Sequence, residues 1–155
     1  MLLAISRIFG KNYIRKNISV LIDTNIIISA GLFPKGKTAA ILRSAVLHCN
    51  ICICTYSIEE FYRVVDRKFP ENKSDAIEFL TNLEFELVEP HGEIIFDDLP
   101  YIRDEKDSPI LQAAIAADIE ILLTGDKDFC DVVCKKPKII GPKEFSRLLP
   151  KHLMQ

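Results

Sequence analysis

Four acidic residues occupy positions from which they could act together, namely Asp23, Glu60, Asp107 and Asp126. Asp23 directly follows the apolar run Ser19–Ile22, and Asp126 follows the run Ile121–Leu123 after a short turn. Ligands of parallel α/β sheets bind beyond the carboxyl ends of the strands, so we expect these acids to meet at that edge. Carboxylates gathered there would repel one another, and a bound divalent cation would remove that penalty.

All-oxygen ligands favour Mg²⁺ or Mn²⁺ over Zn²⁺. One or two such ions suit phosphodiester hydrolysis, because one lowers the pKa of the attacking water and a second can stabilise the leaving oxygen. Two further acids, Asp104 and Asp128, lie close by in the sequence. The pattern therefore predicts a metal-dependent hydrolase.

Each acid except Asp23 also has a purely structural interpretation. Ser57 and Glu60 fit a capping box, while Asp107 and Asp126 could each cap a helix or a turn. Asp23 fits a surface cap poorly because apolar runs flank it on both sides. The four acids taken together favour a shared site over four separate caps.

The elements that would position these acids alternate between short apolar strands and helices. The predicted strands are Ser19–Ile22, Ile51–Cys54, Phe85–Val88, Ile121–Leu123 and Lys138–Ile140. The predicted helices are Thr38–His48, Ser57–Lys68, Ser74–Leu83, Ser108–Ala117 and Pro142–Leu149. Unbroken apolar strands indicate a sheet covered on both faces. We predict a three-layer α/β/α fold with a central, mainly parallel sheet of about five strands.

The chain has 155 residues, which is the length of one domain. We place that domain at 19–155 and regard 1–18 as an N-terminal extension that could form a basic amphipathic helix. Hydrophobic residues make up 48% of the chain and charged residues 27%, as in globular proteins. The net charge of −2 gives no argument for nucleic acid.

Neither a signal-peptide pattern nor an apolar run of membrane-spanning length is found, so we expect a cytoplasmic protein without a membrane partner. The five cysteines are odd in number, which is typical of free thiols in a reducing compartment. Cys49 with Cys52, and Cys130 with Cys134, leave a zinc site as a weaker alternative.

A second motif points to different chemistry. Gly31–Thr38 matches the P-loop pattern, which would make the chain a small nucleotide-binding protein that contacts phosphate through Lys37. A P-loop must connect a strand directly to a helix, whereas Asp-Thr-Asn intervenes here after the first strand. We therefore expect this segment to be a connecting loop and the start of a helix.

The segments around the acids resemble the PIN-domain nucleases from Ser19 to about Leu149. The matching motifs are VLIDTNIIIS with Asp23, the Ser57…Glu60 helix opening, DEKDSPILQAA with Asp107, LTGDKDF with Asp126, and the tail IIGPKEF. The subgroup looks like the VapC-like toxins of toxin–antitoxin pairs. Two departures stand out: similar proteins often have a glycine at Ala117-Asp118, and 1–18 lies outside the common pattern.

The resemblance implies specific roles for residues of this chain. The four acids would bind one or two Mg²⁺ or Mn²⁺ ions, with Asp104 and Asp128 as accessory ligands. Thr24 or Thr124 would orient a ligand or water, and Asn25 would hold a carboxylate or a neighbouring loop in place. The basic groups expected to meet RNA phosphates are Lys37, Lys127 and Lys135.

The function implied by the resemblance is that of an Mg²⁺/Mn²⁺-dependent endoribonuclease that acts as the toxin of a toxin–antitoxin system. Its partners would be RNA and a cognate antitoxin protein, and homodimers are frequent among similar proteins. A PIN-like RNA-processing nuclease without a toxin role is the alternative.

Overall fold

Five parallel strands build the central sheet, and their spatial order is β3-β2-β1-β4-β5. The strands are β1 (Ser19–Ile22), β2 (Asn50–Cys54), β3 (Glu86–Val88), β4 (Ile121–Leu123) and β5 (Lys138–Ile140). Each strand lies within one residue of its predicted bounds, because every one is a short apolar run between turn or helix signals. The computed structural model describes residues 18–90 and 99–150. The predicted N-terminal helix lies outside the described residues.

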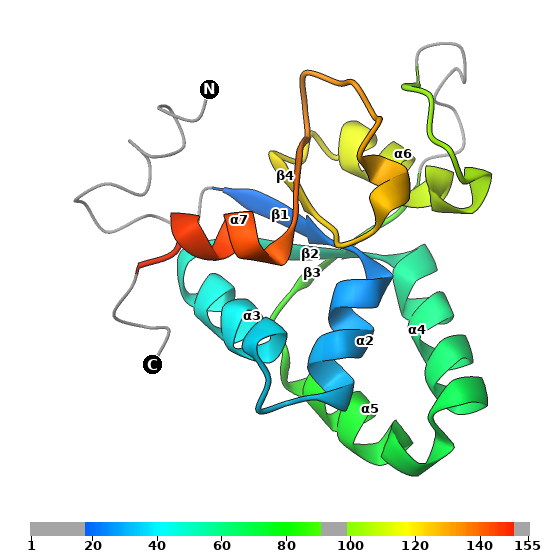
Figure 1. The fold of residues 1–155 in the computed structure, drawn as a ribbon, viewed down its shortest axis with the longest axis vertical. Coiled ribbons are helices and arrows are strands. Elements are labelled where there is room, and N and C mark those ends of the chain that lie inside the picture. Colours follow the sequence, from blue (N-terminus) through cyan, green and yellow to red (C-terminus); the bar gives the residue numbers. More distant parts are fainter. Residues whose placement is uncertain (1–17, 91–98, 151–155) are drawn as a thin grey trace.

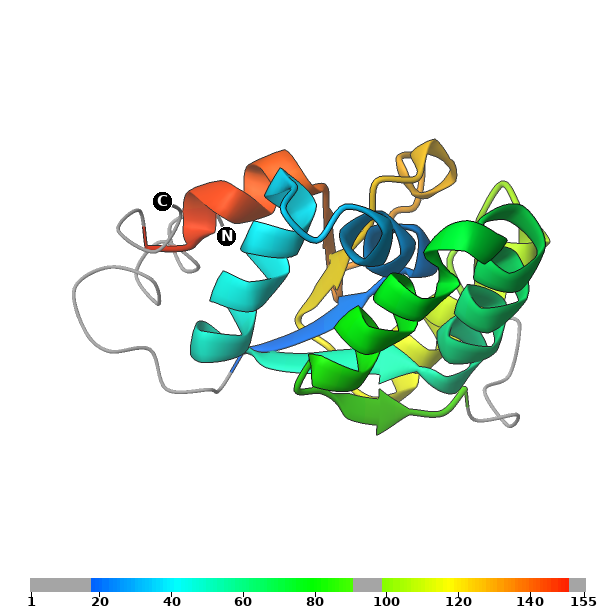
Figure 2. The same ribbon diagram turned by 90° about the horizontal axis from the view of Figure 1, so that it is seen from below.

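Helices cover both faces of the sheet, as Figures 1 and 2 show. The helices are α2 (Thr24–Leu32), α3 (Lys37–His48), α4 (Thr55–Lys68), α5 (Lys73–Asn82), α6 (Ser108–Ala116) and α7 (Pro142–Leu148). Val20 and Ile22 of β1 face one hydrophobic cluster, formed with residues of α2–α5 and α7. Leu21 faces the other cluster, formed mainly with α6. This alternation gives the predicted three-layer α/β/α fold.

Helix α2 was not expected from the sequence. The run Ile26–Ile28 continues directly from the helix start at Thr24, and all three isoleucines are buried. Asn25 is the only exposed residue of α2, so the helix has a weak amphipathic signature and its period is hard to read from the sequence. Gly31 lies in its last turn, where an added Cβ would come within 3.2 Å of the Ala76 Cα atom on α5. The absence of a side chain there lets α2 and α5 pack closely.

The end of α6 explains one departure from the family pattern. Asp118 has a left-handed backbone with φ of 53°, the Asp118 amide donates to the Ile115 carbonyl, and the Ile119 amide donates to the Ala114 carbonyl. These two hydrogen bonds define a Schellman motif, whose left-handed position favours glycine. The sequence places aspartate there at a steric cost.

We expect Asp118→Gly to stabilise the protein by about 1 kcal/mol, because glycine adopts the left-handed conformation without a Cβ clash. The exposed ion pair between Asp118 and Lys136 is removed in this variant, at little cost. Thermal unfolding should show a melting temperature higher by about 2–4 °C. Ala116→Gly, inside the same helix, should lower it. An unchanged or lower value for Asp118→Gly would contradict the steric explanation.

No helix in the described part of the chain is long and apolar enough to cross a membrane.

Candidate active site

The ends of two neighbouring strands hold the first two predicted acids together. β1 and β4 pair in parallel, and the Asp23 amide donates to the Leu123 carbonyl at 3.0 Å. Asp23 therefore starts α2 at the point where the chain leaves β4 toward Asp126. The parallel pairing brings residues about a hundred positions apart to the same edge.

Thr124 links these two acids directly. Its hydroxyl donates to the Asp23 Oδ2 atom at 2.7 Å and accepts from the Asp126 amide at 3.0 Å. Thr124 is 4% exposed and Asp23 only 2%. The predicted role of Thr124 as an orienting residue therefore takes the form of a hydrogen bond that fixes the Asp23 carboxylate.

The Asp23 carboxylate is buried without a cationic partner among the described residues. Burial raises its pKa to about 6, the Thr124 hydroxyl opposes that shift, and repulsion from Asp126 and Glu60 adds to it. Asp23 occupies the N-cap position of α2, but its side chain makes no capping hydrogen bond there. An unpaired buried carboxylate is costly, so the position is poorly explained by stability.

Asp107 lies close enough to the other three acids to be repelled by each of them. Burial raises its pKa to about 7, and the carboxylates of Asp23, Asp126, Asp104 and Glu60 push it in the same direction. Asp107 stands at the N-cap position of α6 and makes no capping hydrogen bond with its side chain. The capping interpretation is wrong for this residue.

The accessory acids form a compact group with Asp107. Asp104, Asp107 and Asp128 each offer a carboxylate oxygen, and these oxygens all lie within 4.8 Å of one another. Arg103 contributes an ion pair with Asp128 at 3.6 Å and a hydrogen bond to Asp131 at 2.8 Å. This arginine, which sequence reasoning missed, ties the segment carrying Asp104 to the turn carrying Asp128.

Two acids do combine a capping role with their place in the cluster. Asp104 accepts from the Lys106 amide at 3.0 Å, and Asp126 accepts from the Asp128 amide at 2.9 Å. Each of these bonds uses only one carboxylate oxygen, which leaves the other oxygen to a ligand. The capping interpretation is therefore correct but incomplete for Asp126, and the cap at Asp104 was not predicted.

The predicted capping box at Ser57 and Glu60 is wrong. α4 begins with Cys54 as its N-cap residue, so Ser57 already lies inside the helix. The Ser57 hydroxyl is fully buried and has no hydrogen-bond partner among the described residues. Glu60 is thus free of a capping role and lies one helical turn beyond the carboxyl end of β2.

The donor set fits a divalent cation. Its ligand atoms would be carboxylate oxygens, the type that Mg²⁺ and Mn²⁺ prefer. Next to Asp23, the Thr24 hydroxyl is 2% exposed and has no hydrogen-bond partner in the described protein, so it could accept or orient a ligand oxygen. Raised pKa values at Asp23 and Asp107 are the expected result of an acidic cluster considered without its cation.

The remaining predicted site residues differ in how close they lie to the acids. Lys127 lies in the exposed turn between Asp126 and Asp128, beside the acids. Lys37 starts α3, at the far end of α2 from Asp23, and the nine residues of α2 alone extend about 13 Å. Asn25 is exposed in the first turn of α2, and Lys135 is exposed as well. Of the lysines predicted to meet RNA phosphates, Lys127 lies directly beside two of the acids, whereas Lys37 is remote from them.

The P-loop alternative is wrong. Gly31 lies inside α2, and Lys37 begins α3 after a short turn, so the segment connects two helices. A P-loop must instead wrap phosphates between a strand and a helix. The match to the pattern is a coincidence of sequence.

The fold also separates the first cysteine pair, Cys49 and Cys52. Cys49 packs in the hydrophobic cluster on one face of the sheet and Cys52 in the cluster on the other. Burial raises the pKa of Cys49 to about 12 and that of Cys52 to about 11, so neither is poised as a thiolate ligand. Both cysteines therefore serve as buried residues of the hydrophobic core.

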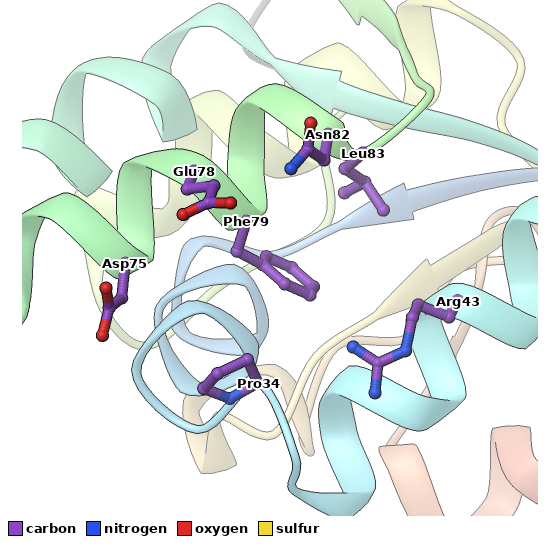
Figure 3. Close-up of a pocket in the computed structure, with 7 residues that line it drawn as sticks. All are labelled: Pro34, Arg43, Asp75, Glu78, Phe79, Asn82 and Leu83. Carbon is purple, nitrogen blue, oxygen red and sulfur yellow. The ribbon is translucent and has the colours of Figure 1, made fainter.

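A cavity lies away from the acids, between the α2–α3 turn, α3 and α5 (Figure 3). Its volume is about 450 Å³. Arg43 on α3 lines one side, and Asp75 and Glu78 on α5 line another. None of the predicted site residues lines this cavity.

Comparison with known proteins agrees with this geometry. The chain's fold resembles that of VapBC2 from Rickettsia felis, solved bound to a promoter DNA fragment, with a TM-score of 0.60 and 18% identity over 80% of this chain and 98% of that one. It also resembles Mycobacterium tuberculosis VapC20, a toxin that cleaves the sarcin–ricin loop, with a TM-score of 0.53 and 12% identity over 74% and 96% of the two chains.

These identities are too low to carry more than the fold. No curated protein sequence matches the chain significantly. A family model for the PIN domain matches residues 19–128, which contain all six predicted acids. The chain belongs to the PIN-domain family.

Proposed function

We propose that this protein is an Mg²⁺- or Mn²⁺-dependent endoribonuclease and the toxin of a toxin–antitoxin pair. The observation that carries the proposal is the convergence of Asp23, Glu60, Asp107 and Asp126. Burial raises the pKa of Asp23 and Asp107, and repulsion from the neighbouring carboxylates adds to the shift. A fold gains no stability from such a cluster, whereas a bound cation would neutralise it. Family membership and the VapC fold support nuclease activity and a protein antitoxin as partner.

The residues of the chain divide the work between them. Asp23, Glu60, Asp107 and Asp126 would hold the cation, with Asp104 and Asp128 beside them. When bound, the cation would activate a water for attack on an RNA phosphodiester and stabilise charge on the phosphate. Thr124 fixes the orientation of Asp23 through its 2.7 Å hydrogen bond.

The proposal predicts that the purified protein cleaves RNA with Mg²⁺ or Mn²⁺ and that EDTA stops the reaction. Cleavage should return when the metal is added in excess of the chelator. Gel analysis of a labelled RNA distinguishes internal cuts from stepwise trimming of an end. Cleavage that continues at full rate in EDTA would exclude the metal-dependent mechanism.

The toxin role needs a separate measurement. Induced expression in a bacterial host should arrest growth, and the Asp126→Asn form should not. Growth unaffected by a protein that cleaves RNA in vitro would instead favour the RNA-processing nuclease.

A further inference from the structure

One face of α4 joins the acidic cluster to two exposed arginines. Tyr56, Glu60, Arg63 and Arg67 are spaced four, three and four residues apart within α4, so they lie in one stripe along the helix. The opposite face of α4 carries Phe61 and Val65, which are fully buried. The stripe therefore points away from Phe61 and Val65. Tyr56 at its start is half-buried against the hydrophobic cluster on the α6 side of the sheet, whereas Arg63 and Arg67 are exposed.

The N-terminal end of this stripe, at Tyr56, lies at the candidate active site. Burial and the nearby Glu60 carboxylate raise the pKa of the Tyr56 hydroxyl, a hydrogen bond from Arg63 opposes that shift, and Asp107 adds to it. Tyr56 thus lies within electrostatic range of two of the four acids. In Figure 1, α4 starts beside the carboxyl end of β2 and runs away from the sheet, so the stripe leads outward from the acids.

The two arginines have no carboxylate partner among residues 18–90 and 99–150. Arg63 lies four residues from Glu59 and three from Glu60, spacings that commonly give ion pairs in helices, yet it bonds Tyr56 instead. Arg67 follows Arg63 by four residues, a like-charge spacing that weakens an isolated helix. Both side chains are exposed. Two neighbouring guanidinium groups without a carboxylate partner among the described residues could each bind one phosphate of a polyanion that lies along α4.

We propose that Tyr56, Arg63 and Arg67 form a phosphate-binding track that holds the RNA strand next to the scissile bond. The proposal rests on the ribonuclease function proposed above and adds to it the path of the substrate. Arg63, held by the Tyr56 hydroxyl close to Glu60, binds the phosphate nearest the acids. Arg67, one turn farther along α4, binds the next phosphate away from the site. Such contacts supply affinity without reading the base sequence.

Binding and cleavage are measured separately to test the track. Fluorescence anisotropy measures the binding of a labelled single-stranded RNA of about 12 nucleotides to the Asp23→Asn protein. This variant is used so that binding is observed without cleavage. Adding Arg63→Gln and Arg67→Gln should weaken binding roughly tenfold and reduce the slope of log K against log salt by about 0.7 for each phosphate that is no longer bound. The matched control is Arg43→Gln with Arg147→Gln, which removes the same charge from α3 and α7 and should leave binding and slope unchanged.

Two further variants separate phosphate binding from helix stability. Arg63→Lys keeps the positive charge and should restore most of the affinity, whereas a structural defect would not be rescued by charge. Tyr56→Phe should raise KM for RNA more than it lowers kcat, because it loosens Arg63 without removing it.

Equal affinity and equal salt slope for the double arginine variant and its parent would overturn the track. An equally weakened α3 and α7 control would overturn it too, because the effect would then be one of net charge. A parent protein that cleaves no RNA, while the α4 variants still bind it more weakly than the control, would leave the track in place and remove the ribonuclease function.

Discussion

Replacing Asp23 with asparagine will abolish RNA cleavage while leaving the fold intact. The substitution keeps the size of the side chain and removes the negative charge that would hold the cation. Loss of a residue that only supports a metal ligand costs roughly 10–100-fold in activity, so loss of a ligand itself should cost more. Initial cleavage rates of a labelled RNA at saturating Mn²⁺ measure the effect.

The same variant should remain folded and gain stability without metal. Asp23 is 2% exposed, and burial is the main reason that its pKa rises to about 6. Asparagine carries no charge to desolvate and can still accept the hydrogen bond from Thr124. At pH 8 and without metal, its melting temperature should therefore be no lower than that of the parent.

The control for Asp23→Asn is Asp75→Asn, the same chemical change at an exposed position of α5 that lines the distant cavity. It should cleave RNA like the parent. An Asp23→Asn protein that cleaves at the parental rate would remove the catalytic role assigned to the acidic cluster.

Without metal, the stability of the parent should fall as the pH rises from about 4 to about 7. Well below pH 3.8 both carboxyl groups are protonated in the folded and the unfolded chain, so neither changes the free energy of unfolding. The unfolded chain then ionises near pH 3.8, while the folded protein retains its protons until about pH 6 at Asp23 and about pH 7 at Asp107. Because the folded state binds more protons across this interval, raising the pH favours unfolding.

The expected size of this loss of stability follows mainly from Asp23, the more buried of the two residues. A shift of about two units at Asp23 corresponds to about 3 kcal/mol, and the partly exposed Asp107 adds less because solvent screens it. A loss of 3 kcal/mol lowers the melting temperature of a chain this long by about 6–12 °C. About half of this loss falls above pH 5, because the unfolded chain is already ionised there while folded Asp23 titrates near pH 6. Differential scanning calorimetry in EDTA should therefore show a melting temperature about 3–6 °C lower at pH 8 than at pH 5.

Added Mn²⁺ should reverse this loss at pH 8 and have little effect at pH 5. A cation at a hundred times its dissociation constant stabilises the folded state by about 2.7 kcal/mol, and protonated carboxyl groups bind it poorly. The Asp107→Asn variant should show a smaller response to both pH and metal. A melting temperature that rises between pH 5 and pH 8 in EDTA, or does not respond to Mn²⁺ at pH 8, would contradict a buried acidic metal site.

The sequence by itself determined the alternation of strands and helices and pointed to the six acids of the candidate site. Short apolar runs bounded by Gly, Pro or helix signals fix strands such as β1 and β4 locally, so their bounds needed no tertiary information. Asp23 was recognisable because a carboxylate between two apolar runs has no local use. Helix α2 escaped because Asn25 is its only exposed residue, which leaves too narrow a polar face to reveal the helical period.

Only the tertiary structure decided which of these residues act together. Parallel pairing of β1 with β4 sets the hydrogen bond between Asp23 and Thr124, a contact across a hundred residues that no local pattern encodes. The length of α2 separates Lys37 from the acids and excludes the P-loop. The nearness of Tyr56 to Asp107 arises from the packing of α4 against α6. Residue types are local properties of the chain, whereas charge proximity and burial depend on packing between distant segments, and those two quantities define the site.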